Sequence, residues 1–303
     1  MNAQELTWLW IPATLIAAAC QVGRNAIQRG LTEKLGTIGA TQVRFLYGFP
    51  FAIVFAAIVL WLTGSDIPQM DLSFFIYICI GAVAQILGTA LMLGAMRQRA
   101  FVVVTAWTKT EPIQVALFGV IVLGEHLSIA AVIAIMISTV GVLLMIRPPL
   151  AQEEKNLHHL KSIAMGILAG TSFAIAAVDF RGAILSLHGS NFLAHASWAL
   201  VFGLGIQALI LTIWMIMFRR EALLGCLKAW RISIWGGLLG ACASQFWFIG
   251  FALTIAANVR TLGLVEILFA QILTWRVFLT KSNRNENIGI ILIVVGMLIL
   301  LSW

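Results

Sequence analysis

The fold class of this chain is decided by one stretch, "AFVVVTAWTKTEPIQVALFGVIVLGEHLS" (residues 100–128). The stretch is apolar over a length that crosses a bilayer as a helix, since about 20 apolar residues span the hydrocarbon. Lys109, Glu111 and Pro112 nevertheless lie at its middle. A charge at the centre of a membrane helix costs roughly 2.5–3.5 kcal/mol, and such residues usually face a cavity or a partner. The stretch therefore predicts a membrane helix that lines a functional path.

The composition extends this prediction to the whole chain. Of its 303 residues, 61% are hydrophobic and 10% are charged, whereas soluble domains average about 45–50% and about 25%. Helices are the expected elements, because long apolar runs without strict alternation form helices in hydrocarbon. We therefore expect an all-α integral membrane protein with ten transmembrane helices, at 8–28, 41–62, 73–95, 101–122, 128–146, 162–184, 192–217, 232–253, 258–279 and 287–302.

The longest polar link divides these runs into two sets of five. We expect a first five-helix unit at 1–147, a cytoplasmic linker at 148–161 and a second five-helix unit at 162–303. An odd number of spans in each half forces the halves to insert with opposite orientation. The predicted architecture is therefore two inverted repeats around a central cavity, a common plan of secondary transporters.

Weak internal similarity supports the repeat. A shift of 155 residues places GVLLMI (141–146) on GMLILL (296–301) and Glu111 on Glu266. A shift of 157 residues places Arg24 on Arg181. These matches indicate that the two halves share one plan.

The basic residues of the links lie on one side of the expected membrane. Thirteen of them, from Arg29 and Lys34 to Lys281 and Arg284, fall opposite the N-terminus. We call the side of the N-terminus side A and the opposite side side B. Since Lys and Arg concentrate in cytoplasmic loops, side B should be cytoplasmic. Both termini should then be periplasmic, in a protein of the cell inner membrane. The net charge of +7 reflects these links, so no nucleic acid partner is expected.

Charged residues inside the runs are the candidate substrate or proton ligands. Glu111 and Glu266 lie too deep for a short side chain to reach water, and Lys109 is equally deep. Lys109 needs a partner, which is Glu266, Asp179 or the substrate, and a purely structural ion pair is the alternative reading of these charges. Trp107 lies one turn from Glu111 and could stack on a cationic or aromatic substrate. The predicted binding residues are Lys109, Glu111, Glu266, Trp107, Gln85, Gln245 and Arg260.

Other charges near the ends of runs have different expected roles. Arg24, Asp179 and Arg181 are the candidate gate residues, since the repeat places the two arginines at opposite mouths of one path. Arg44 and Arg276 lie near side B, where long basic side chains reach the interface. Pro112 is expected to kink its helix.

Several chemistries lack their motifs. The sequence has no GxxxxGK[ST] loop for ATP, no HExxH and no CxxC. The four cysteines show no metal-ligand spacing and are expected to be free thiols. We expect no enzyme activity, no cofactor and no metal.

At this point the pattern resembles a known family. TEPIQVALFGVIVLGEHLS (110–128) resembles the hallmark of EamA-type proteins in the drug/metabolite transporter superfamily, through Glu111-Pro112 and Gly124-Glu125. QVRFLYGFPFA (42–52) resembles the second span of that family. The second half departs from the pattern, with Ile267 in place of Pro and Thr280 in place of the closing Glu. The resemblance implies a cavity between the halves and transport of small organic solutes.

The sequence thus predicts a secondary transporter that works by alternating access. Charges of both signs favour a small polar or amphipathic metabolite, such as an amino acid or other zwitterion, and proton-coupled export is one mode that buried carboxylates would support. The expected partners are the substrate, the lipid bilayer and protons, in a monomer or homodimer. Two alternatives stay open: a lipid or lipid-phosphate flippase, and a membrane partner protein that transports nothing.

Overall fold

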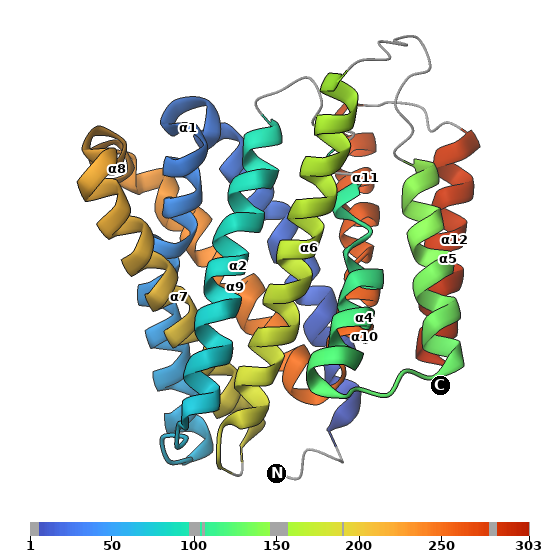
Figure 1. Cartoon of the computed structure of the whole chain (residues 1–303), viewed down its shortest axis with the longest axis horizontal. Helices are drawn as coiled ribbons and strands as arrows, with labels where there is room; N and C mark the ends of the chain where they lie inside the picture. The colour runs from blue at the N-terminus through green and yellow to red at the C-terminus, as the bar shows by residue number, and fades with distance from the viewer. Residues whose placement is uncertain are drawn as a thin grey trace.

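The computed structural model describes residues 6–96, 104, 107–145, 157–189, 191–278 and 284–302. These residues form helices joined by short links (Figure 1). Six of the described helices are long and apolar enough to cross a membrane. The helices are η1 (Thr7–Leu9), α1 (Trp10–Thr63), α2 (Leu72–Met96), α4 (Glu111–Leu123), α5 (Ile129–Met145), α6 (Leu157–Ser186), α7 (Phe192–Phe218), α8 (Arg220–Lys228), α9 (Trp230–Leu253), α10 (Ala256–Leu262), α11 (Val265–Phe278) and α12 (Arg284–Leu301).

Helix α1 contains the first two predicted spans. It rises from the N-terminal end of the molecule, turns at the far end and descends again (Figure 1). The turn contains Gly36, which has φ 72° and ψ 174° inside an otherwise helical segment. Glycine adopts a positive φ without the steric cost that other residues bear. The predicted link between the spans is therefore mostly helical, and Gly36 supplies the bend.

Two predicted spans are broken at their middle. A turn at Lys109 and Thr110 precedes α4, and a turn at Gly263 and Leu264 separates α10 from α11. Pro112 therefore lies in the first turn of a new helix, where its missing N–H breaks no helical bond. The prediction that Pro112 kinks a continuous helix is wrong for this reason.

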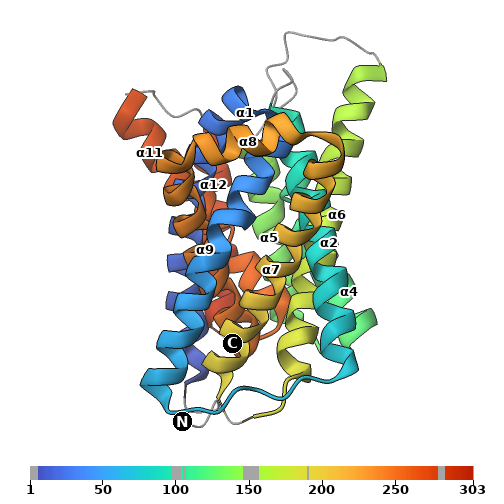
Figure 2. The same cartoon turned by 90° about the vertical axis from the view of Figure 1, so that its left-hand side faces the viewer.

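The link after α7 forms a helix that the sequence did not predict. Figure 2 shows α8 lying across the side B end of the molecule, roughly at right angles to α7 and α9. Its Cys226 is buried, and the thiol donates to the carbonyl of Gly39 at 3.4 Å. The helix therefore packs onto the bend of α1 and caps this end of the molecule.

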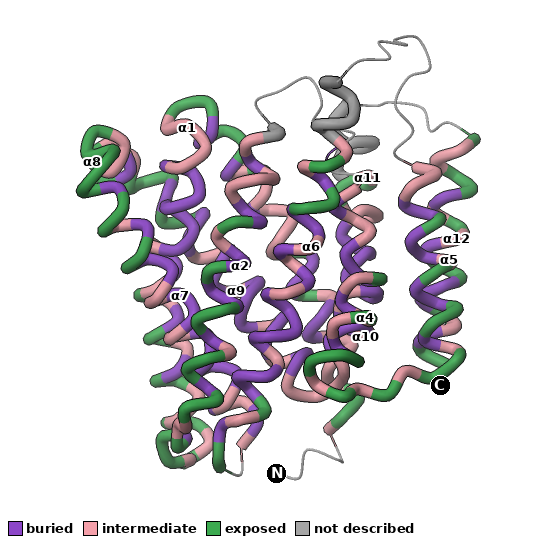
Figure 3. Tube along the Cα trace, viewed as in Figure 1, coloured by how far each residue is buried: buried purple, intermediate pink, exposed green. Residues whose placement is uncertain are grey.

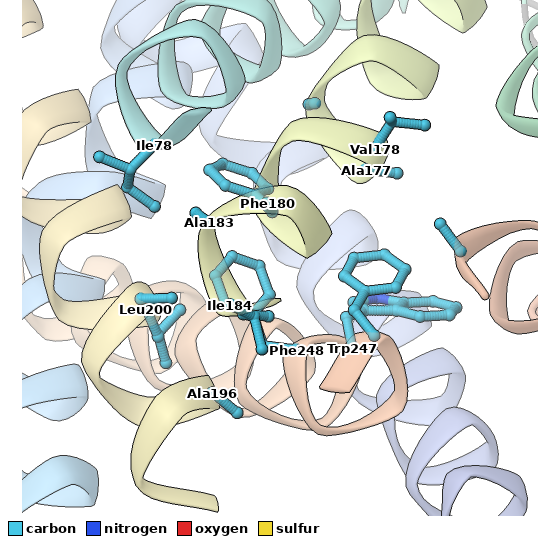
Figure 4. Close-up of a cluster of buried hydrophobic side chains, with 14 of the residues drawn as sticks. Ile78, Ala177, Val178, Phe180, Ala183, Ile184, Ala196, Leu200, Trp247 and Phe248 are labelled. Atoms are coloured by element: carbon cyan, nitrogen blue, oxygen red, sulfur yellow. The ribbon is translucent and has the colours of Figure 1, made fainter. Parts of the chain in front are cut away.

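The pattern of buried and exposed residues is the one expected for a protein whose outer surface faces lipid. Figure 3 shows buried residues along the inward faces of the helices and exposed residues along the outward faces. Large apolar side chains such as Trp61 and Ile129 are about 80% exposed, as expected for helices that face lipid. Inside, α6, α7 and α9 share a cluster that includes Phe180, Leu200 and Phe248 (Figure 4). The ring centroids of Phe180 and Phe248 are 4.8 Å apart, so this cluster supports the helices that surround the site described below.

Helices α5 and α12 pack on one another through glycines (Figure 1). A Cβ at Gly141 would lie 2.7 Å from the carbonyl oxygen of Gly289, and a Cβ at Gly296 would lie 2.9 Å from that of Ala134 and overlap Ser138. Gly141 and Gly296 are also mates in the 155-residue shift. Small residues let two membrane helices approach closely, so this pair depends on both glycines.

The glycine contact gives a first prediction. Gly296→Ala should lower the free energy of unfolding by about 1–3 kcal/mol, because the added methyl overpacks a tight contact. Thermal unfolding in detergent measures the change. Gly30→Ala is the matched control, since its Cβ would meet nothing within 4 Å and alanine favours a helix. An unchanged unfolding temperature for Gly296→Ala would contradict the close packing.

Candidate functional site

The two helix breaks contribute opposite charges to one cluster. The Lys109 ammonium forms an ion pair with the Glu266 carboxylate. The side-chain amide of Gln21 donates to the other Glu266 oxygen, and the Trp247 indole donates to Gln21 Oε1 at 3.1 Å. Both breaks thus meet side chains of α1 and α9. Of the two protein partners expected for Lys109, Glu266 is the one that it contacts, and the described residues include no ion pair of Asp179.

In the second ion pair, the acid comes from the first half of the chain and the cation comes from the second half. Arg260 of α10 lies beside Glu111 at the start of α4, with 3.1 Å between Nε and Oε1. These two atoms lie within ion-pair distance, although their geometry is not that of a hydrogen bond. The Arg260 guanidinium also lies over the Trp247 ring, 4.8 Å from its centroid, and 5.4 Å from that of Phe251. Each break therefore supplies an acid to a cation from the other half of the chain.

A cavity of about 50 Å³ adjoins both ion pairs. This volume holds one or two waters, at about 30 Å³ each, and is too small for an organic metabolite. A smaller pocket of about 20 Å³ adjoins it at Glu266 and the Gly263–Leu264 turn. The cavity is lined by Gln21, Arg24, Asn25, Arg44, Gln85, Met92, Thr108, Lys109, Glu111, Phe173, Trp247 and Arg260.

Six of the residues predicted from sequence come together at these two pockets. Lys109, Glu111, Arg260, Arg24 and Gln85 line the cavity, and Glu266 lines the adjoining pocket. Gln85 also accepts a hydrogen bond from Gln207 at 2.8 Å.

Other predicted residues lie elsewhere. The Trp107 Cβ lies against Gly166 of α6, and Trp107 is not among the residues that line either pocket. Gln245 faces α7 instead, where it donates to Ser197 Oγ at 2.9 Å. The structure does not bring these two side chains to the cavity. Their positions inside apolar runs did not reveal which face of the helix they occupy.

Several cavity residues were not predicted as ligands. Arg44 is buried and donates to Thr89 Oγ1 at 3.1 Å, so the expectation that it reaches the interface is wrong. The packing of α1 against neighbouring helices places Arg44 at the cavity and not at the lipid interface. Gln21 lies three residues before Arg24, a spacing that places both on one helix face and could have identified it. The side chain of Arg276 lies outside the described residues.

Arg181 lies near the side A end of α6 and contacts the ends of two other helices. Its Nε donates to the Glu125 carboxylate, and its Nη1 donates to the carbonyls of Phe251 and Thr254, the latter at 2.5 Å. These contacts join α6 to the end of α4 and the end of α9. Asp179 is buried on the same helix. Of the three candidate gate residues, Arg181 therefore ties helices together, whereas Arg24 lines the cavity.

Comparison with known proteins agrees with this arrangement. Residues 8–147 match the EamA-like transporter family, which comprises transporters rather than enzymes. No curated protein sequence matches the chain. A solved structure, titled only "Crystal structure of protein", is similar over 97% of this chain and 95% of its own, with a TM-score of 0.70 and 14% identity. That similarity concerns the fold. With its apolar helices and buried charges, the chain is a multi-pass membrane protein whose residues 8–147 are similar to the EamA-like transporter family.

Proposed function

We propose that this transporter moves a small polar or amphipathic organic metabolite across the inner membrane by alternating access. The supporting observation is the pair of crossed ion pairs at the two helix breaks, Lys109 with Glu266 and Arg260 with Glu111. Secondary transporters commonly place substrate sites where helices are discontinuous near the middle of the bilayer. A site that joins both halves of the chain can respond when the halves move against each other.

The proposal treats residues 1–147 and 162–303 as inverted five-helix repeats around a central cavity. The 155-residue shift that relates Glu111 to Glu266 also relates the two breaks, since it carries Lys109 onto Leu264. Figure 1 shows the start of α1 and the end of α12 at the same end of the molecule, as an even number of passes requires. The linker at 148–161 is then cytoplasmic and both termini are periplasmic. Alkaline phosphatase fused to the C-terminus should be active in cells, and an inactive fusion would reverse this orientation.

The ion pairs also suggest how substrate enters. The cavity is smaller than a metabolite, so binding requires the pairs to part. A substrate amine can compete for Glu266 or Glu111, and a substrate anion can compete for Lys109 or Arg260. Protonation of a carboxylate has the same effect on its ion pair, which would couple transport to a proton gradient. An amino acid or other zwitterion offers both kinds of group.

Uptake into proteoliposomes tests the proposal. Purified protein is reconstituted and tested with a panel of labelled amino acids, organic acids, amines and neutral solutes, with and without a proton gradient. We expect uptake of at least one charged solute above protein-free vesicles, and loss of that uptake in Glu266→Gln. Arg231→Gln is the matched control and should transport normally, because Arg231 is an exposed residue in the first turn of α9.

The same preparation separates the alternatives. A fluorescent phospholipid that moves between leaflets, with no solute uptake, would indicate a flippase. No uptake, no lipid movement and no thermal shift with any solute would indicate a partner protein with structural charges. Either result would contradict the proposed solute transport.

A further inference from the structure

Two arginines in the cavity wall lack acidic partners. Arg24 is 3% exposed and Arg44 is 4% exposed. Arg24 Nη2 donates to the side chain of Asn25 at 2.8 Å, and Arg44 Nη1 donates to Thr89 at 3.1 Å. Arg24 Nε and Nη1 and Arg44 Nε have no hydrogen-bond partner among the described residues. Each guanidinium therefore retains unused donors in a buried position.

The two side chains converge on one place. A Cβ at Gly240 of α9 would lie 3.4 Å from Arg24 Cδ and 3.4 Å from Arg44 Cγ. Both side chains thus pass over the same glycine, and both line the cavity. The absence of a side chain at Gly240 gives them room to lie next to each other. Like charges this close repel unless an anion lies between them.

The acids near the cavity are already neutralised by other cations. Glu266 pairs with Lys109, and Glu111 pairs with Arg260. Together with Arg24 and Arg44, the cluster therefore holds four cations and two acids, an excess of two positive charges. Burying an uncompensated charge is costly. An anion from outside the chain would compensate this excess positive charge and lower the free energy of the site.

We propose that Arg24 and Arg44 form an anion subsite that binds a carboxylate or phosphate group, so that the transported solute is an organic anion. This proposal rests on the transport function proposed above and narrows its substrate class. Guanidinium groups present parallel N–H donors that match the oxygens of carboxylate and phosphate. Lys109 and Arg260 line the same cavity, where they can meet a second acidic group.

Binding of simple anions tests the subsite without any transport assay. Thermal unfolding of the purified protein in detergent is followed with succinate, inorganic phosphate, succinamide or glycine, at constant ionic strength. Succinate or phosphate should raise the unfolding temperature and neutral succinamide should not, whereas glycine, which has one carboxylate beside a cationic amine, should raise it less than succinate does. Arg24→Gln and Arg44→Gln should each weaken the apparent affinity for the anion at least tenfold, and Arg231→Gln should bind as the wild type does.

The unliganded variants give a second readout that a structural role would not produce. Removing a buried charge that lacks a partner should leave the unfolding temperature of Arg24→Gln unchanged or higher when no anion is present. A structural arginine would instead leave a less stable protein. Lower stability of both variants without anion, or equal anion binding by wild type and variants, would overturn the proposal.

Two further measurements distinguish a failure of the anion subsite from a failure of the proposed transport function. A thermal shift with phosphatidylglycerol but not with succinate or phosphate would assign the anion to a lipid headgroup and overturn the soluble substrate. Anion binding that depends on Arg24, without uptake of any solute, would retain the subsite and contradict the transport function. Uptake of only neutral or cationic solutes would retain transport and overturn the anion subsite.

Discussion

Lys109→Met should abolish solute uptake and lower the stability of the protein by about 3–5 kcal/mol, because it leaves the Glu266 carboxylate buried without its cation. Among the described residues, only the hydrogen bond from Gln21 remains on that carboxylate. Thermal and chemical unfolding in detergent measure the loss of stability, and proteoliposome uptake measures the loss of transport.

The double variant Lys109→Met/Glu266→Gln separates binding from structure. It removes both charges and keeps an acceptor for Gln21, so most of the stability should return. Uptake should remain absent, because the ligands are gone. A double variant that recovers both stability and uptake would show that the ion pair only joins the helices.

Arg181→Gln should open the side A end of the protein. The substitution removes the ion pair to Glu125 and the donor to the carbonyls of Phe251 and Thr254. Ala177 is fully buried one helical turn away on the same face of α6 (Figure 4). A cysteine introduced there, in a variant without the native cysteines, reports whether water reaches this depth.

Labelling by a water-soluble maleimide in lipid nanodiscs measures the opening. We expect Ala177→Cys to react at least tenfold faster when combined with Arg181→Gln, because a buried thiol reacts only when solvent reaches it. Glu125→Gln should act in the same direction, since it removes the same ion pair. Arg219→Gln is the control, because Arg219 is an exposed basic residue at the end of α7. Equal labelling in all variants would exclude a closing role for Arg181.

The apolar runs were predictable from sequence, because bilayer thickness sets their length and composition. The breaks were harder to predict. Gly263 and Leu264 are residue types that are common within membrane helices, so they did not indicate a break. The charge of Lys109 was evident from the sequence, but it did not show that the helix ends there. The link between the first two runs gave no sign that α1 would continue as a helix through a bend at Gly36.

The site was only partly predictable for a related reason. A charge deep in a run indicates that some partner exists, and this identified Lys109, Glu111 and Glu266. Which partner it meets depends on how distant helices rotate against each other. Arg44 shows the limit most clearly, because its sequence position near side B fits a snorkelling side chain and only the packing of its neighbours makes it a cavity residue.

The central claim is that the charges at the helix breaks bind substrate rather than only hold the halves together. Exchanging the two partners, as Lys109→Glu/Glu266→Lys, keeps an ion pair at the same place and reverses its direction. The most direct test is uptake by this variant, measured beside its unfolding temperature. The account predicts a folded protein that has lost at least 90% of its uptake, roughly a tenfold change or about 1.4 kcal/mol. Uptake at the wild-type rate would contradict it.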